Sequence, residues 1–147
     1  REPAPMALIV LRIEGLAGTE AALGVAAASV LRRKVAVRLR AALRASDVVA
    51  SIGDDAFAVL LAWIDASAAA PRVASKLARA LAQPLTVAGQ ARAFAVASGM
   101  ASYPEHGRDA ATLLRRATAQ AAQRATVGST GMASRIERGP TPAANDD

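Results

Sequence analysis

The sequence contains no cysteine and a single histidine, His106. Without thiols neither disulfide bonds nor thiolate-bound metals can form, and one imidazole cannot make a histidine-rich metal site. The 147-residue sequence also contains no apolar run that approaches the length of about 18 residues that a membrane-spanning helix needs. The first six residues are polar and interrupted by proline, unlike a secretory signal peptide. We therefore expect no metal centre, no cofactor, no membrane span and a cytoplasmic location.

Aromatic residues make up only 3% of the chain, although 53% of it is apolar. The core must therefore be built mainly from alanine, valine and leucine. The net charge of +6 fits either an anionic partner or an arginine-rich solvated surface. A platform for single-stranded nucleic acid also needs aromatic side chains beside the basic groups. Because the few aromatic residues lie mostly in apolar strand-like stretches, we expect no nucleic-acid partner.

The hydrophobic pattern predicts an α+β domain, in which helices flank a central, mainly antiparallel sheet. Short apolar runs bounded by turn residues predict strands at residues 7–13, 48–52, 57–64, 85–87, 93–101 and 132–136. Apolar residues recurring every three or four positions predict helices at residues 20–44, 71–83 and 109–126. Asp109 is the predicted N-cap of the last helix. Gly53 and the two aspartates after it predict a hairpin turn between the second and third strands.

Two segments carry a recognisable pattern. Residues 51–61 read S-I-G-D-D-A-F-A-V-L-L, and residues 98–104 read S-G-M-A-S-Y-P. They resemble the R-[LY]-G-G-[DE]-E-F-x-[VI]-[LI]-L and S-I-G-[IV]-A-x-Y-P patterns of the GGDEF family, the diguanylate cyclases of bacterial signalling. The matching order and spacing extend over residues 7–136. The resemblance implies a nucleotide-cyclase, palm-like fold with a ferredoxin-like core.

The resemblance also sets the expected domain limits. Residues 1–6 are expected to be an N-terminal linker and residues 7–137 a degenerate GGDEF domain. Residues 138–147 are rich in glycine, proline, asparagine and aspartate, which predicts a disordered tail or linker. The family's D-x-L-T-G-L-x-N-R motif has no counterpart in the sequence.

The resemblance implies that the catalytic residues are lost. Diguanylate cyclases condense two GTP molecules with divalent cations, held by one carboxylate at the end of the first strand and another in the turn. Arg12 stands at the first position and Asp55 at the second, and we expect them to pair. Ala56 replaces a glutamate that helps to activate the attacking hydroxyl. The degenerate turn consists of Gly53, Asp54, Asp55, Ala56 and Phe57. The family's guanine and phosphate contacts fall on Glu20, Ser29, Ala125 and Ser129.

One regulatory motif of the family is retained. Many GGDEF domains bind inhibitory cyclic di-GMP at an R-x-x-D motif just before the turn, and Arg44-Ala45-Ser46-Asp47 has that spacing. The arginine fork suits a phosphate or the Hoogsteen edge of guanine, and the aspartate can accept from guanine N–H groups. We expect exposed Arg44 and Asp47 side chains, with Lys76 and Arg72 completing the site. The alternative is a plain ion pair at i,i+3 spacing.

These observations favour a signalling module without enzymatic activity. It would be a cyclic di-GMP receptor that acts on a neighbouring sensor or output domain or on a protein partner, and a homodimer is compatible with it. A second hypothesis is a dimerisation or docking pseudo-enzyme that binds no nucleotide. A GTP-binding allosteric domain and an active diguanylate cyclase are less favoured, because the guanine and metal positions have changed.

Overall fold

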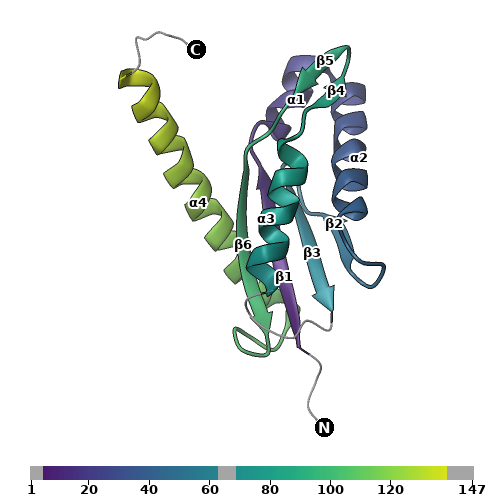
Figure 1. The fold of residues 1–147 in the computed structure, drawn as a ribbon, viewed down its shortest axis with the longest axis vertical. Helices are drawn as coiled ribbons and strands as arrows, with labels where there is room; N and C mark the ends of the chain where they lie inside the picture. The colour runs from purple at the N-terminus through teal and green to yellow at the C-terminus, as the bar shows by residue number, and fades with distance from the viewer. Residues whose placement is uncertain (1–4, 63–68, 139–147) are drawn as a thin grey trace.

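Four antiparallel strands form the central sheet, in the order β2-β3-β1-β6 (Figure 1). The computed structural model describes residues 5–62 and 69–138, with their side chains up to residue 124. The strands of the sheet are β1 (Met6–Ile13), β2 (Val48–Ser51), β3 (Ala56–Ala62) and β6 (Val96–Tyr103). A separate hairpin contains β4 (Leu85–Val87) and β5 (Gln90–Arg92). The predicted α+β class with a mainly antiparallel sheet is confirmed.

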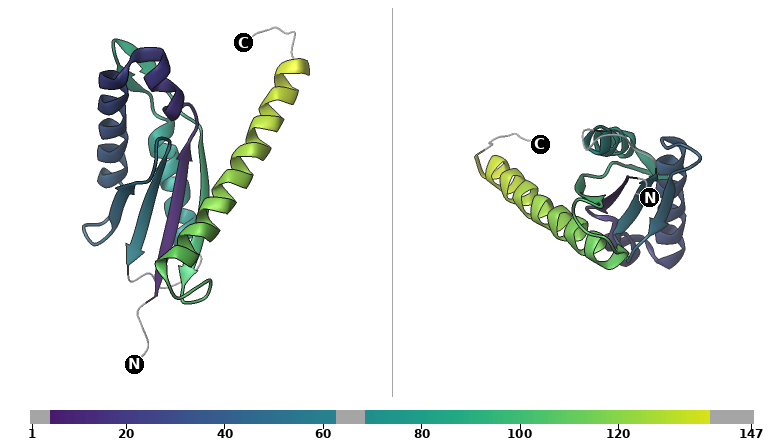
Figure 2. Two further views of the ribbon diagram at one scale, coloured as in Figure 1. Left: turned by 180° about the vertical axis from the view of Figure 1, so that it is seen from behind. Right: turned by 90° about the horizontal axis from the view of Figure 1, so that it is seen from below.

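Helices cover both faces of this sheet. They are α1 (Leu16–Leu23), α2 (Val25–Ala41), α3 (Ala69–Ala82) and α4 (Ala110–Arg138). Figure 2 shows α4 on the face opposite to α2 and α3. Alternate residues of a strand point to opposite faces, so Ile9 and Leu11 of β1 pack in the core with α2 and α3, and Val10 packs against α4. Within residues 5–62 and 69–138, none of the helices has the length and hydropathy of a membrane span.

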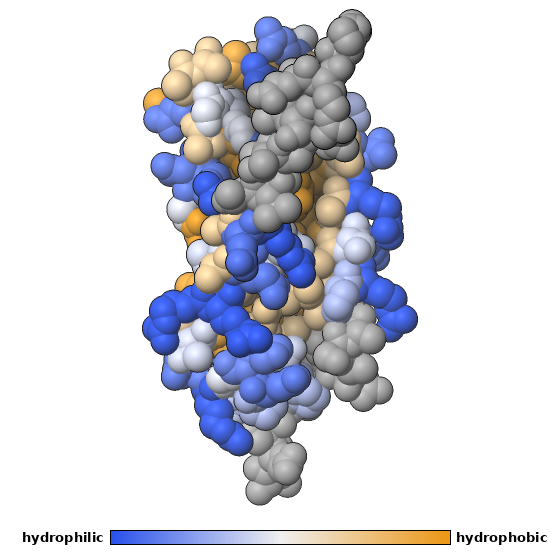
Figure 3. All heavy atoms as spheres, turned by 90° about the vertical axis from the view of Figure 1, so that its left-hand side faces the viewer, coloured by the Kyte–Doolittle hydropathy of each residue, from blue (hydrophilic) through white to orange (hydrophobic). Residues whose placement is uncertain are grey.

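The first half of α4 lies along β6, an edge strand of the sheet. The amide N–H of Met100 donates to Oε1 of Gln120 at 2.8 Å, and Nη1 of Arg124 donates to the carbonyl oxygen of Ser98 at 3.1 Å. Side chains of α4 thus bind backbone groups at an edge where no further strand of the described residues pairs. Figure 3 shows this side of the molecule, where apolar side chains form a central band between hydrophilic ones.

The prediction of one long helix over residues 20–44 is wrong. This part of the chain forms two helices, α1 and α2, with Gly24 between them. Gly24 has a φ of +96°, a left-handed conformation that glycine adopts without the steric penalty that a side chain brings. Helix α2 also ends at Ala41, so Arg44 lies in the connection to β2 rather than in the helix.

One predicted strand and one expected strand pairing are also wrong. Residues 132–136 belong to α4, which extends to Arg138. The predicted strand at residues 85–87 is confirmed as β4, but the expected hairpin between it and residues 93–101 is not: β4 pairs with residues 90–92, and β6 pairs with β1. Met6, expected in the linker, is the first residue of β1. The end of the predicted strand at residues 63–64 and the predicted tail at residues 139–147 lie outside the described residues.

Candidate functional site

The β2–β3 turn lies against the end of β1. The amide N–H of Ile52 donates to the carbonyl oxygen of Ala56 at 2.9 Å, which closes the turn, and Gly53 supplies a φ of +82°. The strand register places Arg12 of β1 directly opposite Ala56 of β3. The predicted hairpin around Gly53 is therefore confirmed, and it brings together the two positions at which the resemblance places catalytic groups.

Arg12 forms an ion pair with Asp55, as the sequence predicted. Nε of Arg12 lies 3.2 Å from Oδ2 of Asp55, and about half of the Arg12 side chain is exposed. The pair borders a cavity of about 300 Å³ between the turn and α4, whose lining also includes Val10 and Thr118. A magnesium ion at this place would meet a guanidinium beside its carboxylate ligand, so these residues do not suit a divalent cation. Among the described residues, no cluster of three or more acidic or histidine side chains offers another metal site.

Arg44 and Asp47 form a two-point contact in the connection between α2 and β2. Nε and Nη2 of Arg44 donate to Oδ2 and Oδ1 of Asp47 at 3.3 and 3.0 Å, respectively. The backbone N–H of Arg44 also donates to Oδ2, at 2.9 Å. Nη2 donates further to the carbonyl oxygen of Ala62 at the end of β3, at 2.7 Å. The fork geometry fixes the plane of the guanidinium, and the bond to Ala62 ties it to the sheet.

Arg40 holds the same connection from the last turn of α2. Its guanidinium donates to the backbone carbonyl oxygens of Arg44 and Asp47. The spacing of the R-x-x-D motif does not predict this role for Arg40. The i,i+4 spacing of Arg40 and Arg44 near a helix end was the available signal, because basic side chains there often bind the last free carbonyl groups.

The expectation that both motif side chains are exposed is wrong for Asp47. Its side chain is only 3% exposed, whereas that of Arg44 is 56% exposed. Burial by itself would raise the pKa of Asp47, but the hydrogen bonds and charge of Arg44, together with the charge of Arg40, outweigh it and hold this pKa below its ordinary value. The carboxylate is therefore ionised at neutral pH and directed at Arg44, not at solvent.

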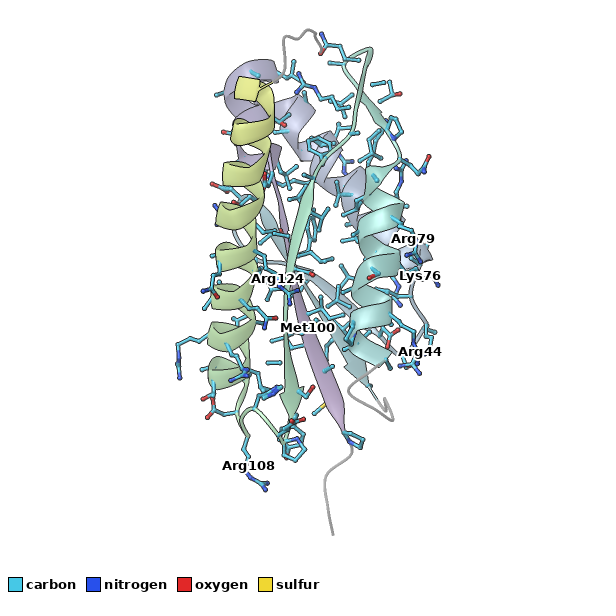
Figure 4. All side chains as sticks on the ribbon, turned by 60° about the vertical axis from the view of Figure 1, so that its left-hand side comes forward. Arg44, Lys76, Arg79, Met100, Arg108 and Arg124 are labelled. Atoms are coloured by element: carbon cyan, nitrogen blue, oxygen red, sulfur yellow. The ribbon has the colours of Figure 1, made fainter. Side chains whose placement is uncertain are left out.

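Lys76 and Arg72 lie exposed on α3, but they do not join this pair directly. Among the described residues, no hydrogen bond or ion pair links either of them to Arg44 or Asp47. In Figure 4, Arg44 lies on the same side of the molecule as Lys76 and Arg79 of α3. The structure thus places exposed cations of α3 on the same side of the molecule as the motif.

The Asp47 pair gives a stability prediction that depends on pH. Asp47→Asn will lower the free energy of unfolding by about 1.5–3 kcal/mol at pH 7, the usual contribution of a hydrogen bond to a charged group. The folded-state pKa lies below the ordinary value of about 3.9, so this stabilisation is present above that pH and disappears as the pH falls through the folded-state pKa. The thermal stabilities of parent and variant should therefore converge at acid pH, below the folded-state pKa of Asp47.

The control for this measurement is Asp54→Asn, at an exposed carboxylate of the β2–β3 turn. This variant should match the parent protein within about 0.5 kcal/mol, as surface substitutions usually do. A stability difference for Asp47→Asn that stays constant between neutral and acid pH would contradict the ion-pair explanation.

Comparisons with known proteins agree with the arrangement of strands, helices and turn. The family model described as "Diguanylate cyclase, GGDEF domain" matches residues 1–129. Diguanylate cyclase TpbB from Pseudomonas aeruginosa (strain UCBPP-PA14) is 38% identical over 96 residues, which are 65% of this chain and 22% of that protein. The chain thus spans less than a quarter of the length of this curated relative.

Solved structures show the same similarity. The crystal structure of the GGDEF domain of TpbB from Pseudomonas aeruginosa superposes with a TM-score of 0.75 at 32% identity, covering 80% of this chain and 74% of that one. An EAL/GGDEF domain protein from M. capsulatus superposes with a TM-score of 0.78 at 31% identity, covering 86% and 81%. The fold, the hairpin turn and these similarities together establish that the chain belongs to the GGDEF domain family of diguanylate cyclases.

Proposed function

We propose that this domain synthesises no cyclic di-GMP and instead binds it at Arg44, as a receptor that signals to a neighbouring domain or protein partner. The observation that carries the proposal is the two-point contact of Arg44 with Asp47, which fixes an exposed guanidinium in one plane. A preorganised arginine loses little conformational entropy when a ligand binds. We place the module in the cytoplasm, because its ligand is made from GTP, a cytoplasmic nucleotide.

Arg44 retains donors for a ligand after its internal contacts are counted. A guanidinium carries five N–H groups, and Asp47 and Ala62 accept from Nε and Nη2. Among the described residues no acceptor meets Nη1, so its two N–H groups can donate to guanine O6 and N7 or to a phosphate. The flat face of the guanidinium can also stack on a base.

Asp47 acts in this proposal as a positioning residue. The resemblance implies a direct contact between this aspartate and guanine, but the carboxylate is buried and already accepts three N–H groups of Arg44. Its proposed contribution is to hold the guanidinium of Arg44 toward the ligand. The loss of Asp47 would then weaken binding through Arg44.

Exposed cations on α3 supply the remaining charge. Arg72, Lys76 and Arg79 follow one another at i, i+4 and i+7, so they share one face of the helix. A cyclic dinucleotide carries two negative phosphates, and cations on the same side of the molecule as Arg44 lower the free energy of its bound state. Lys76 should contribute less than Arg44, because an ammonium lacks the arginine fork.

Calorimetric titration with cyclic di-GMP and, separately, with GTP tests the proposal. The parent domain should bind cyclic di-GMP with micromolar affinity. Arg44→Ala should weaken binding at least tenfold, since a hydrogen bond to a charged group contributes about 1.5–3 kcal/mol and about 1.4 kcal/mol is tenfold in affinity. Lys76→Ala should have a smaller effect. Arg108→Ala, at an exposed arginine far from Arg44 in Figure 4, is the matched control and should bind like the parent.

A docking or dimerisation domain without nucleotide is the second candidate. The observation that favours it is the completeness of the ion pair, since Arg44 already stabilises the α2–β2 connection without a ligand. A flat titration of the parent domain at high micromolar cyclic di-GMP would reject the receptor proposal and leave this one.

A further inference from the structure

A groove of about 750 Å³ lies between α2 and β4, and neither the β2–β3 turn nor Arg44 lines it. One wall is the outer face of α2, from Val30 to Ala41, and the other is the chain from Pro84 to Thr86. The α2 wall spans about three helical turns, roughly 16 Å at 1.5 Å per residue. The groove is therefore long enough to hold a short helical segment alongside α2.

Hydrogen bonds fix the two walls relative to each other. Nζ of Lys34 donates to the carbonyl oxygen of Thr86 at 2.6 Å. The guanidinium of Arg38 donates to the carbonyl oxygens of Gln83 and Pro84, where α3 gives way to β4. Because these contacts join α2 to the β4 side directly, the groove is preformed and a ligand would not have to open it.

Apolar side chains of α2 are exposed in the groove. Val30 and Val37 are 37% and 67% exposed, and at i,i+7 spacing they lie on one face of α2. Pro84 provides apolar surface on the opposite wall. Burying these groups against a partner would be favourable in proportion to the apolar area removed from water.

The charge of the groove has one sign. Arg33, Lys34 and Arg38 line it, and no acidic residue does. Within the described part of the chain, none of these three cations forms an ion pair. A partner with acidic side chains beside an apolar stripe would match both features.

We propose that this groove binds an acidic amphipathic helix from a protein partner or a neighbouring domain. Helices that dock in grooves present apolar residues at i, i+3, i+4 and i+7, which fits the spacing of Val30 and Val37. Glutamate or aspartate on the flanks of that stripe would pair with Arg33 and its neighbours. A concave surface accepts an inserted row of side chains, whereas a flat lipid surface would leave it unfilled. The inference does not depend on nucleotide binding at Arg44.

Selection from a displayed library of helical peptides tests the groove. The library keeps one apolar stripe and randomises every other position, and the full domain is the target. Enriched peptides should carry acidic residues beside the stripe. Synthetic copies of the enriched peptides should bind the Val37→Asp variant at least about tenfold more weakly than the parent domain. They should also bind the Arg33→Glu variant more weakly than the parent. Enrichment of basic or neutral peptides, or of none, would overturn the proposal.

Val25→Asp is the matched control, because Val25 is equally exposed on α2, at 68%, but lies outside the groove. It should bind the peptides like the parent, and equal affinities for Val37→Asp and the parent would overturn the proposal. Circular dichroism checks the fold of each variant, and Arg33→Glu still tests the groove if Val37→Asp unfolds.

Sedimentation with phosphatidylglycerol–phosphatidylcholine vesicles should show no binding that depends on Val37. Vesicle binding lost in Val37→Asp would assign the groove to a membrane and reject the helix. Titration of Val37→Asp with cyclic di-GMP should match the parent, which separates this groove from Arg44.

Discussion

Incubated with GTP and Mg²⁺ or Mn²⁺, this domain should yield no cyclic di-GMP above an enzyme-free control. Arg12 pairs with Asp55 at 3.2 Å, at the place where the resemblance puts a metal site. Ala56, which can neither accept a proton nor bind a metal, lies opposite Arg12. Under the proposed function the turn has no general base, which alone costs on the order of 10²–10⁴ in rate, and binds no metal, which removes several kcal/mol of further stabilisation. Chromatographic separation of the nucleotides measures the outcome.

The GGDEF domain of TpbB, assayed in parallel, is the positive control for this experiment. A second comparison uses the double substitution Arg12→Asp and Ala56→Glu, which replaces the cation and adds two carboxylates beside Asp55. Mn²⁺ should raise the melting temperature of this variant and leave that of the parent unchanged, because metal binding to the folded state stabilises it. Robust turnover by the parent domain would show that Arg12 does not occupy the metal position.

Gly99→Ala should be among the most destabilising single substitutions in the domain. A Cβ atom at Gly99 would lie 2.0 Å from the carbonyl oxygen of Ala117 and 2.6 Å from the amide nitrogen of Ala121. Both are backbone atoms of α4, so the helix itself must move away from β6. Overpacking of this kind typically costs about 1–3 kcal/mol and occasionally more, and we expect about 3 kcal/mol here. The melting temperature should fall by roughly 6–12 °C for a domain of this size.

Gly18→Ala is the matched control for Gly99→Ala. A Cβ atom at Gly18 meets nothing within 4 Å, and the residue lies inside α1. Alanine is favoured over glycine in a helix by about 0.5–1 kcal/mol, so this variant should equal or exceed the parent in stability. Urea denaturation followed by circular dichroism measures both variants. A Gly99→Ala protein as stable as the parent would show that α4 does not pack so closely on β6.

Structural features that are set by residues adjacent in the chain could be predicted from the sequence. Gly53 and the aspartates after it predicted the β2–β3 hairpin, because turn conformations are decided by a few adjacent residues. Asp109 predicted the start of α4, and its Oδ1 accepts from the backbone N–H of Thr112 at 2.8 Å. The pairing of Arg12 with Asp55 also followed, once the family pattern placed the turn beside the first strand.

Other features were decided by contacts between distant parts of the chain. The partner of β6 is β1, with Ile9 opposite Met100 far away in sequence, and local patterns cannot choose between two apolar partners. Asp47 is buried and bound by Arg44 and Arg40, which both precede it in the chain, an arrangement that motif spacing does not contain. The groove exists because α2 and β4 are joined by hydrogen bonds across about fifty residues of chain.

The sequence by itself determined the family, the hairpin and the candidate arginine, because these depend on local pattern. Only the tertiary structure decided which side chains are buried, which are held in place and which surfaces remain open, because long-range packing sets them.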